Sequence, residues 1–135
     1  MAALERGSTT FLIAASGREN GVSVLRLNAS GQFSAVSDFG LAQGLPVAGV
    51  SDLAVARLGG QDFVLVAAAQ TSSISVLRLD AAGKLSFASQ VADTLHSRFS
   101  GVTAMDLLEI SGQVFVAAAA KMAGSRCCNC CQMAN

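Results

Sequence analysis

The chain has 135 residues, 52% hydrophobic and only 13% charged, which is enough for one modest domain and too apolar for a chain that is disordered throughout. Nine basic residues balance nine acidic ones, so nothing in the charge points to nucleic acid or an anionic membrane as a partner. No run of about 20 apolar residues is present, and the first six residues, MAALER, lack the apolar core of a signal peptide. We therefore expect no membrane span and see no export signal in this chain.

A repeat with a period of 52 residues runs through the chain. The segment Phe11–Ala15 recurs as Phe63–Ala67 and again as Phe115–Ala119, and Ser23–Leu27 recurs unchanged as Ser75–Leu79. Two glycine positions keep the same offset: Gly31 matches Gly83, and Gly49 matches Gly101. Because every match has one spacing, no net insertion or deletion separates the copies.

Residues 1–9 form an N-terminal segment, and residues 10–49 supply three strands of a first copy. The next copy reads as four strands, which we place at Val50–Leu58, Asp62–Ala69, Ser73–Leu79 and Leu85–Val91. A further two strands follow up to residue 120. Four short strands in each repeat of roughly 40–50 residues are typical of a β-propeller blade.

The predicted fold is therefore all-β: residues 10–120 form a partial β-propeller of four-stranded antiparallel blades, with about 52 residues per repeat and a little over two blades. A β-sandwich also has many short strands, but it does not explain a repeat held in register. A helical solenoid is disfavoured because the repeated segments are rich in β-branched residues and lack a 3.6-residue period.

Residues 121–135 read KMAGSRCCNCCQMAN and break the pattern where the third copy should supply its next strand. If the coding frame is shifted by one base, one allowed reading is N-G-G-I-S-L-L-Q-L-L-P-N-G-E. With a small gap, this peptide matches the strand and turn of the first copy, GVSVLRLNASGQ. We therefore predict a frame slip near Lys121 and a tail that is not native to the fold.

All four cysteines lie in this tail, between Cys127 and Cys131. They form two overlapping C-x-x-C pairs, a spacing that thiolate-bound zinc or copper(I) uses. The cluster has no histidine and no second pair at a distance, so it lacks the frame of a zinc finger or ribbon. We assign no metal, cofactor or catalytic residues in this chain.

A family resemblance is carried by the run Ser72–Leu79, the turn Ala82–Leu85 and the segment Asp93–Ala104, which contains Arg98-Phe99 followed by Gly101-Val102-Thr103-Ala104. Over roughly residues 9–120 the chain resembles the N-terminal propeller region of bacterial hemolysin-type calcium-binding (RTX) proteins. The resemblance implies type I secretion of a full-length parent and an extracellular location. It also implies calcium bound by G-G-x-G-x-D nonapeptides, which this chain lacks, so calcium is expected only in C-terminal repeats of the parent.

Few side chains are candidates for chemistry. The only histidine, His96, falls in a connection between strands, where a solvated loop residue is expected. Arg26 and Arg78 occupy equivalent strand positions, which favours solvent-facing side chains over an anion site. The acidic residues of turns and strand ends would matter if they lined a central channel: Asp38, Asp52, Asp62, Asp80, Asp93 and Asp106.

These observations favour a non-enzymatic role, namely an interaction or structural module of a secreted RTX-like protein that binds a protein or glycan ligand. The alternatives are a fragment of a lactonase-like propeller hydrolase and a truncated gene product with no function of its own. Since an incomplete propeller leaves strand edges unpaired, we also expect self-association through those edges.

Overall fold

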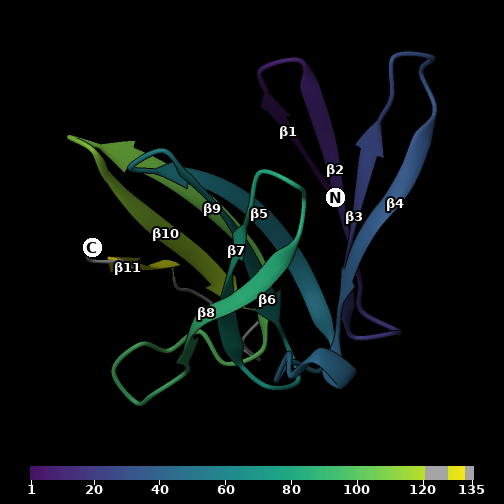
Figure 1. Cartoon of the computed structure of the whole chain (residues 1–135). Coiled ribbons are helices and arrows are strands. Elements are labelled where there is room, and N and C mark those ends of the chain that lie inside the picture. Colours follow the sequence, from purple (N-terminus) through teal and green to yellow (C-terminus); the bar gives the residue numbers. More distant parts are fainter. Residues whose placement is uncertain (121–127, 133–135) are drawn as a thin grey trace.

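The computed structural model describes residues 1–120 and 128–132 and shows an all-β chain whose strands pair antiparallel in three sheets. The sheets stand side by side in chain order, and within each sheet every strand pairs with its neighbours in sequence (Figure 1). Sheet 1 contains β1 (Ala2–Arg6), β2 (Thr9–Ser16), β3 (Gly21–Leu27) and β4 (Phe33–Phe39). Sheet 2 contains β5 (Val50–Leu58), β6 (Gln61–Ala68), β7 (Ser73–Leu79) and β8 (Leu85–Ala92). Sheet 3 contains β9 (Val102–Ile110), β10 (Gln113–Ala120) and β11 (Cys128–Gln132).

The four strands predicted for the second copy match β5 to β8 to within one residue at each end. Residues 1–9 hold an additional strand, β1, which pairs with β2, so the three strands read for the first copy become four. The described strands form three sheets and no closed ring. The predicted frame slip falls on the tail, which lies outside the described residues except for the backbone of β11, paired with β10.

The 52-residue repeat extends to the backbone geometry. The β3–β4 ladder shifts register between Val24 and Leu25, and the β7–β8 ladder shifts between Val76 and Leu77, one period later. The residue before the third strand has a positive φ in both complete sheets, 52° at Asn20 and 47° at Ser72. The two four-stranded copies therefore share the same local conformation, including its irregular positions.

The β3–β4 and β7–β8 turns are built in the same way. Asn28 Oδ1 accepts backbone N–H bonds from Ser30 at 3.0 Å and Gln32 at 2.8 Å. In the next copy, Asp80 Oδ1 accepts bonds from the backbone N–H groups two and four residues further on, at 2.9 and 2.8 Å. A short side-chain acceptor followed by a glycine with positive φ stabilises this turn, which explains why Gly31 and Gly83 recur.

Side chains alternate between two faces of each sheet, and the same face meets the next sheet each time. We call the face that bears Phe11 and its equivalents the front face, and the face that bears Leu12 and its equivalents the rear face. The front of sheet 1 and the rear of sheet 2 share one apolar core, to which Ile13 and Val64 belong. The front of sheet 2 and the rear of sheet 3 share the other, which contains Leu65 and Val116.

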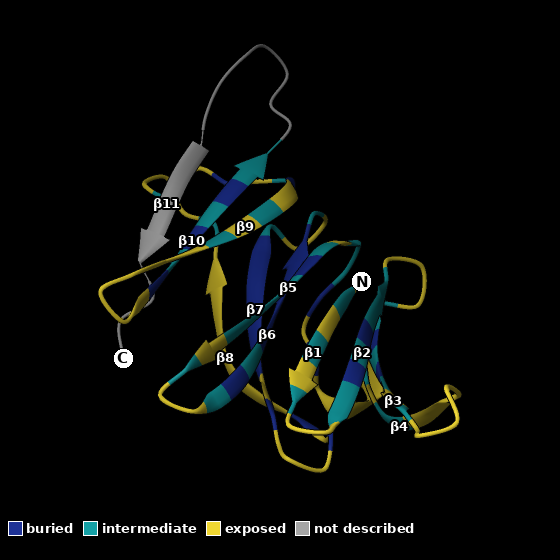
Figure 2. Ribbon diagram, turned by 90° about the horizontal axis from the view of Figure 1, so that it is seen from above, coloured by how far each residue is buried: buried dark blue, intermediate teal, exposed yellow. Residues whose placement is uncertain are grey.

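The burial pattern follows from this order. Sheet 2 lies between the other two sheets, and its central strands β6 and β7 are almost continuously buried (Figure 2). Its last strand, β8, is exposed beyond its first residue, Leu85. Apart from these sheets, the described chain has one short 3₁₀ helix, η1 (Leu41–Gln43), and contains no helix with the length and apolarity needed to cross a bilayer.

The segments that connect the sheets also repeat. Val47, in the connection before β5, is 4% exposed and belongs to the core between sheets 1 and 2. Phe99, one period later in the connection before β9, is 1% exposed and belongs to the second core. Each connection therefore inserts an apolar side chain into the core at the rear face of the sheet that it leads into.

Candidate functional site

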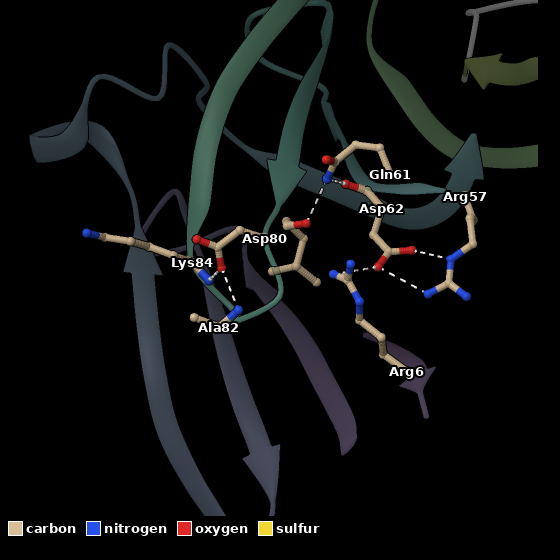
Figure 3. A network of polar contacts seen from close by, with 8 residues as sticks. Arg6, Arg57, Gln61, Asp62, Asp80, Ala82 and Lys84 are labelled. Carbon is tan, nitrogen blue, oxygen red and sulfur yellow. Dashed lines mark hydrogen bonds and ion pairs between the residues drawn. The ribbon is translucent and has the colours of Figure 1, made fainter. Parts of the chain in front are cut away.

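The only buried acidic side chain among the described residues is Asp62, at the start of β6. The hairpin register places Arg57 of β5 directly opposite it, and the guanidinium donates Nε–H to Oδ1 at 2.6 Å and Nη2–H to Oδ2 at 3.1 Å. Arg6, at the end of β1 in sheet 1, brings Nη1 to 3.4 Å from the same Oδ2 (Figure 3). One carboxylate thus meets two guanidinium groups from two different sheets.

This cluster is a link between sheets rather than an open binding site. The side chain of Asp62 is fully buried, while those of Arg6 and Arg57 are 36% and 48% exposed. The hydrogen bonds from Arg57 to Asp62, together with the opposite charge, raise the pKa of Arg57 above its ordinary value. Both oxygens of the carboxylate are occupied, and the ion pair with Arg6 links the end of β1 in sheet 1 to sheet 2.

Sequence reasoning included Asp62 among the candidate acids but did not identify its two arginine partners. A signal was present for one of them, because Gly59-Gly60 ends β5 and a tight hairpin there brings residues 57 and 62 face to face. Nothing in the repeat identifies Arg6, since its equivalents one and two periods later are Leu58 and Ile110.

Asp52 is a second link between sheets. Its Oδ1 accepts the backbone N–H of Leu53 at 2.8 Å, and its Oδ2 accepts that of Met105 in β9 at 2.6 Å. Beside it, the Ser51 hydroxyl donates to the Val102 carbonyl at 2.6 Å. The first strands of sheets 2 and 3 are therefore joined by polar contacts as well as by packing.

The remaining acids serve local structure. Asp93 Oδ1 accepts from the backbone N–H of Phe99 at 2.7 Å and so organises the connection before β9. Asp80 forms the β7–β8 turn described above, and Asp106 Oδ1 accepts from the next backbone N–H. Asp38 accepts a bond from the Ser23 hydroxyl at 2.5 Å. The structure does not gather the six candidate acids at one place, and no group of three or more possible metal ligands occurs in the described part of the chain.

The other predicted candidates are also spread out. His96 is exposed, and its backbone N–H donates to the Thr94 hydroxyl in the connection between sheets 2 and 3. Arg26 and Arg78 are both exposed, as predicted. Arg26 contacts sheet 2, however, because its Nη2 donates to the Ala82 carbonyl at 3.2 Å. Within sheet 1, its guanidinium carbon lies 5.7 Å from the centre of the Phe11 ring.

The rear face of sheet 1 is more exposed than the equivalent face of sheet 2. In sheet 2 the rear positions Val64, Leu77 and Leu79 are fully buried. Their equivalents one period earlier are only partly buried, although they are all leucine. Phe33, the equivalent of buried Leu85, is 52% exposed. The rear face of sheet 1, hereafter the open rear face, consists of Leu12, Ala14, Ser23, Leu25, Leu27 and Phe33.

A pocket of about 250 Å³ lies at one end of this face, between the β2–β3 connection and the end of β4. Ala14 and Ser23 of the open rear face form part of its wall, and Glu19, Asp38 and Gln43 give it polar groups. Two carboxylates make it acidic.

The equivalent place on sheet 2 is filled. Gln90, one period after Asp38, donates from Nε2 to the Pro46 carbonyl at 3.0 Å, and the backbone N–H of Ala48 donates to the Thr71 hydroxyl at 3.4 Å. Thr71 is one period after Glu19. The connecting segment that carries Val47 therefore occupies on sheet 2 the position that is a pocket on sheet 1. The open rear face with its pocket is the candidate functional surface of the chain.

The sequence did not point to this surface, because the leucines of the two copies look alike until their neighbours in space are known. Comparisons with known proteins add no further identification: no protein-family model and no curated protein matches the chain.

Proposed function

We propose that the chain is part of a repeat-built β-propeller that serves as an interaction or structural module of an exported, RTX-like calcium-binding protein. The observation that carries this proposal is the regular stacking of the sheets. The front of each sheet packs on the rear of the next, with the same register shifts and turn conformations one period apart. Radial repetition of four-stranded antiparallel sheets is the building rule of propellers.

A binding role is favoured over catalysis by the use that the described polar residues make of their side chains. Asp62 and Asp52 link neighbouring sheets, Asp80 and Asp93 order turns, and His96 lies on an exposed connection. These are structural roles. The ligand that we propose is a protein or a glycan bound at the exterior of the assembled sheets.

The RTX-like part of the proposal rests on the resemblance of the segment Asp93–Ala104. In the structure this segment is the connection that places Phe99 in the core and supplies the first three residues of β9, Val102 to Ala104. Its recurrent glycine, Gly101, has a φ of +67°, as does Gly49 one period earlier. The motif that carries the resemblance therefore has a structural task within the repeat, and calcium binding would belong to repeats outside this chain.

The proposal is tested by sequencing the coding DNA across codons 115 to 135 and translating the downstream bases in all three frames. We expect a one-base shift to restore a leucine-rich strand, followed by further 52-residue copies and G-G-x-G-x-D nonapeptides. Secretion of the encoded parent into the medium would then be measured directly. A verified stop after Asn135 with no further copy in any frame would overturn the RTX-like assignment.

A further inference from the structure

Two faces of the described molecule have the composition of core and no sheet against them. One is the open rear face of sheet 1. The other is the front face of sheet 3, where Leu108 and Ile110 of β9 are 57% and 50% exposed and Phe115 of β10 is partly buried. On the front of sheet 1 the equivalents of Phe115 and Leu108 are covered: Phe11 is fully buried, and Leu4 packs against the same core.

The two faces are of the two kinds that pack together elsewhere in this molecule. Twice within the molecule a front face is covered by a rear face. Among the described residues, no rear face covers the front of sheet 3, and no front face covers the rear of sheet 1. A contact between these two faces would repeat the established junction without requiring any new kind of packing.

A recurrent glycine leaves space for an aromatic ring at the junction between two sheets. At Gly83, on the rear side of sheet 2, an added Cβ would lie 2.6 Å from Cε1 of Phe11, so the aromatic ring of sheet 1 occupies the space that the glycine leaves. At Gly31, one period earlier on sheet 1, no heavy atom of the described residues lies within 4 Å of that point. Phe115 is the equivalent of Phe11 on the exposed front of sheet 3. A second molecule can therefore place Phe115 over Gly31 as Phe11 is placed over Gly83.

We propose that two copies of this chain associate head to tail, with the front face of sheet 3 of each copy packed on the open rear face of sheet 1 of the other. The proposal rests on the propeller architecture proposed above. Because each copy brings three sheets, two copies bring six, within the range of about four to eight blades that closed propellers have, whereas three copies would bring nine. This contact uses the faces of the sheets, unlike the association through strand edges expected from the sequence.

The first measurement is the mass of the full chain in solution by light scattering and sedimentation velocity. A reducing agent is included so that the cysteines of the tail cannot crosslink copies. We expect a discrete species of about twice 13.7 kDa at micromolar concentration. A monomer throughout the accessible concentration range would overturn the proposal, and so would indefinite growth, because a closed pair leaves no face open.

Two single substitutions identify the faces. Leu25→Asp blocks the open rear face, and Leu108→Asp blocks the front of sheet 3, so each variant alone should be monomeric with an unfolding transition close to that of the original chain. Mixed in equal amounts, they should form a 1:1 pair through the one junction that remains intact. Ala81→Asp, in an exposed turn of sheet 2, is the control and should stay dimeric.

The same pair of variants excludes other modes of contact. If sheet 1 packed on sheet 1 of the partner, Leu108→Asp would remain dimeric, and if strand edges paired, both variants would; either result overturns the proposal. Gly31→Asn provides a test that does not depend on a buried charge, because asparagine tolerates a positive φ while its side chain fills the site meant for Phe115. We expect it to weaken association at least tenfold, and unchanged association would contradict the proposal. None of these results depends on the downstream DNA, so the two proposals fail separately.

Discussion

Sheets 1 and 2 have nearly the same pattern of residues in two different surroundings. Both carry the strand SVLRL, the same register shift in the following ladder and the same turn ahead of the fourth strand. Leu77 is fully buried in sheet 2, whereas Leu25 in sheet 1 is partly exposed. The apolar residues of a repeat therefore mark the positions that become core when a neighbouring sheet covers them. Sheet 1 keeps these residues on its rear face although no sheet of the described structure covers that face.

Truncating equivalent leucines should separate the two surroundings most strongly. Leu77→Ala removes a fully buried side chain and leaves a cavity, so we expect it to lower the free energy of unfolding by about 3 kcal/mol. Leu25→Ala at the same position of sheet 1 should cost less than about 1 kcal/mol, because part of that side chain is already in water. Urea denaturation at low protein concentration measures both. Equal losses would mean that sheet 1 is covered even in the isolated chain.

The recurrent turn glycines provide the second comparison. Gly31→Ala and Gly83→Ala both force alanine to a φ near +80°, so both variants carry similar backbone strain. Only at Gly83 does the added methyl group also meet Phe11 and Val36, and we expect an additional loss of about 2 kcal/mol there. The difference between the two midpoints of thermal unfolding isolates this packing term. A difference close to zero would contradict the close contact between Phe11 and Gly83.

The third comparison replaces Asp62, which pairs with Arg57 and Arg6, and the equivalent residue of sheet 1. Asp62→Asn leaves two arginines without their carboxylate, and we expect a loss of about 2 kcal/mol, reduced from the value for a fully buried pair because both guanidinium groups are partly in water. Thr10→Ala at the equivalent position of sheet 1 should cost much less, since Thr10 is only partly buried. Chemical denaturation of both variants checks the contrast. Similar small losses would show that the cluster contributes little to holding the sheets together.

The smallest expected effects are those of two equivalent serines, whose replacement should change the free energy of unfolding in opposite directions. Ser75 is fully buried, and its hydroxyl has no hydrogen-bond partner among the described residues, so Ser75→Ala should raise the stability by up to about 1 kcal/mol. Ser23→Ala at the same position of sheet 1 removes the bond to Asp38 and should lower the stability by about 0.5 kcal/mol. The two denaturation midpoints should therefore move in opposite directions. A loss at Ser75 would imply that its hydroxyl has a partner.

The strands were predictable because the repeat is strong and local. Val50–Leu58 and Ser73–Leu79 were placed at their observed bounds, since a glycine turn, an aspartate turn and β-branched residues mark these ends. The sequence does not indicate a strand at residues 2–6, because AALER shares little with its equivalent AVARL one period later. Pairing with β2 supplies what the local sequence lacks.

The candidate surface was less predictable, because it depends on which side chains share a face and on what covers that face. Alternation along Ser23–Leu27 is readable from the sequence, but the direction in which sheets stack is a property of the assembled molecule. A hint was present in the connections, where Val47 and Phe99 keep an apolar residue one period apart. The link through Arg6 could not be foreseen, since it does not repeat and joins residues 56 positions apart.

The order of strands within the sheets bears on how the chain folds. Because each strand pairs only with its neighbours in sequence, every ladder closes a short loop, and the entropy lost in forming it is small compared with that of a sheet whose strands cross over. The strand ladders of each sheet therefore form from nearby residues, and the junctions between sheets are contacts between nearest neighbours, as in other repeat proteins. Synthesis on the ribosome would release such units in order, so that sheet 1 is complete before the residues of sheet 3 have been made.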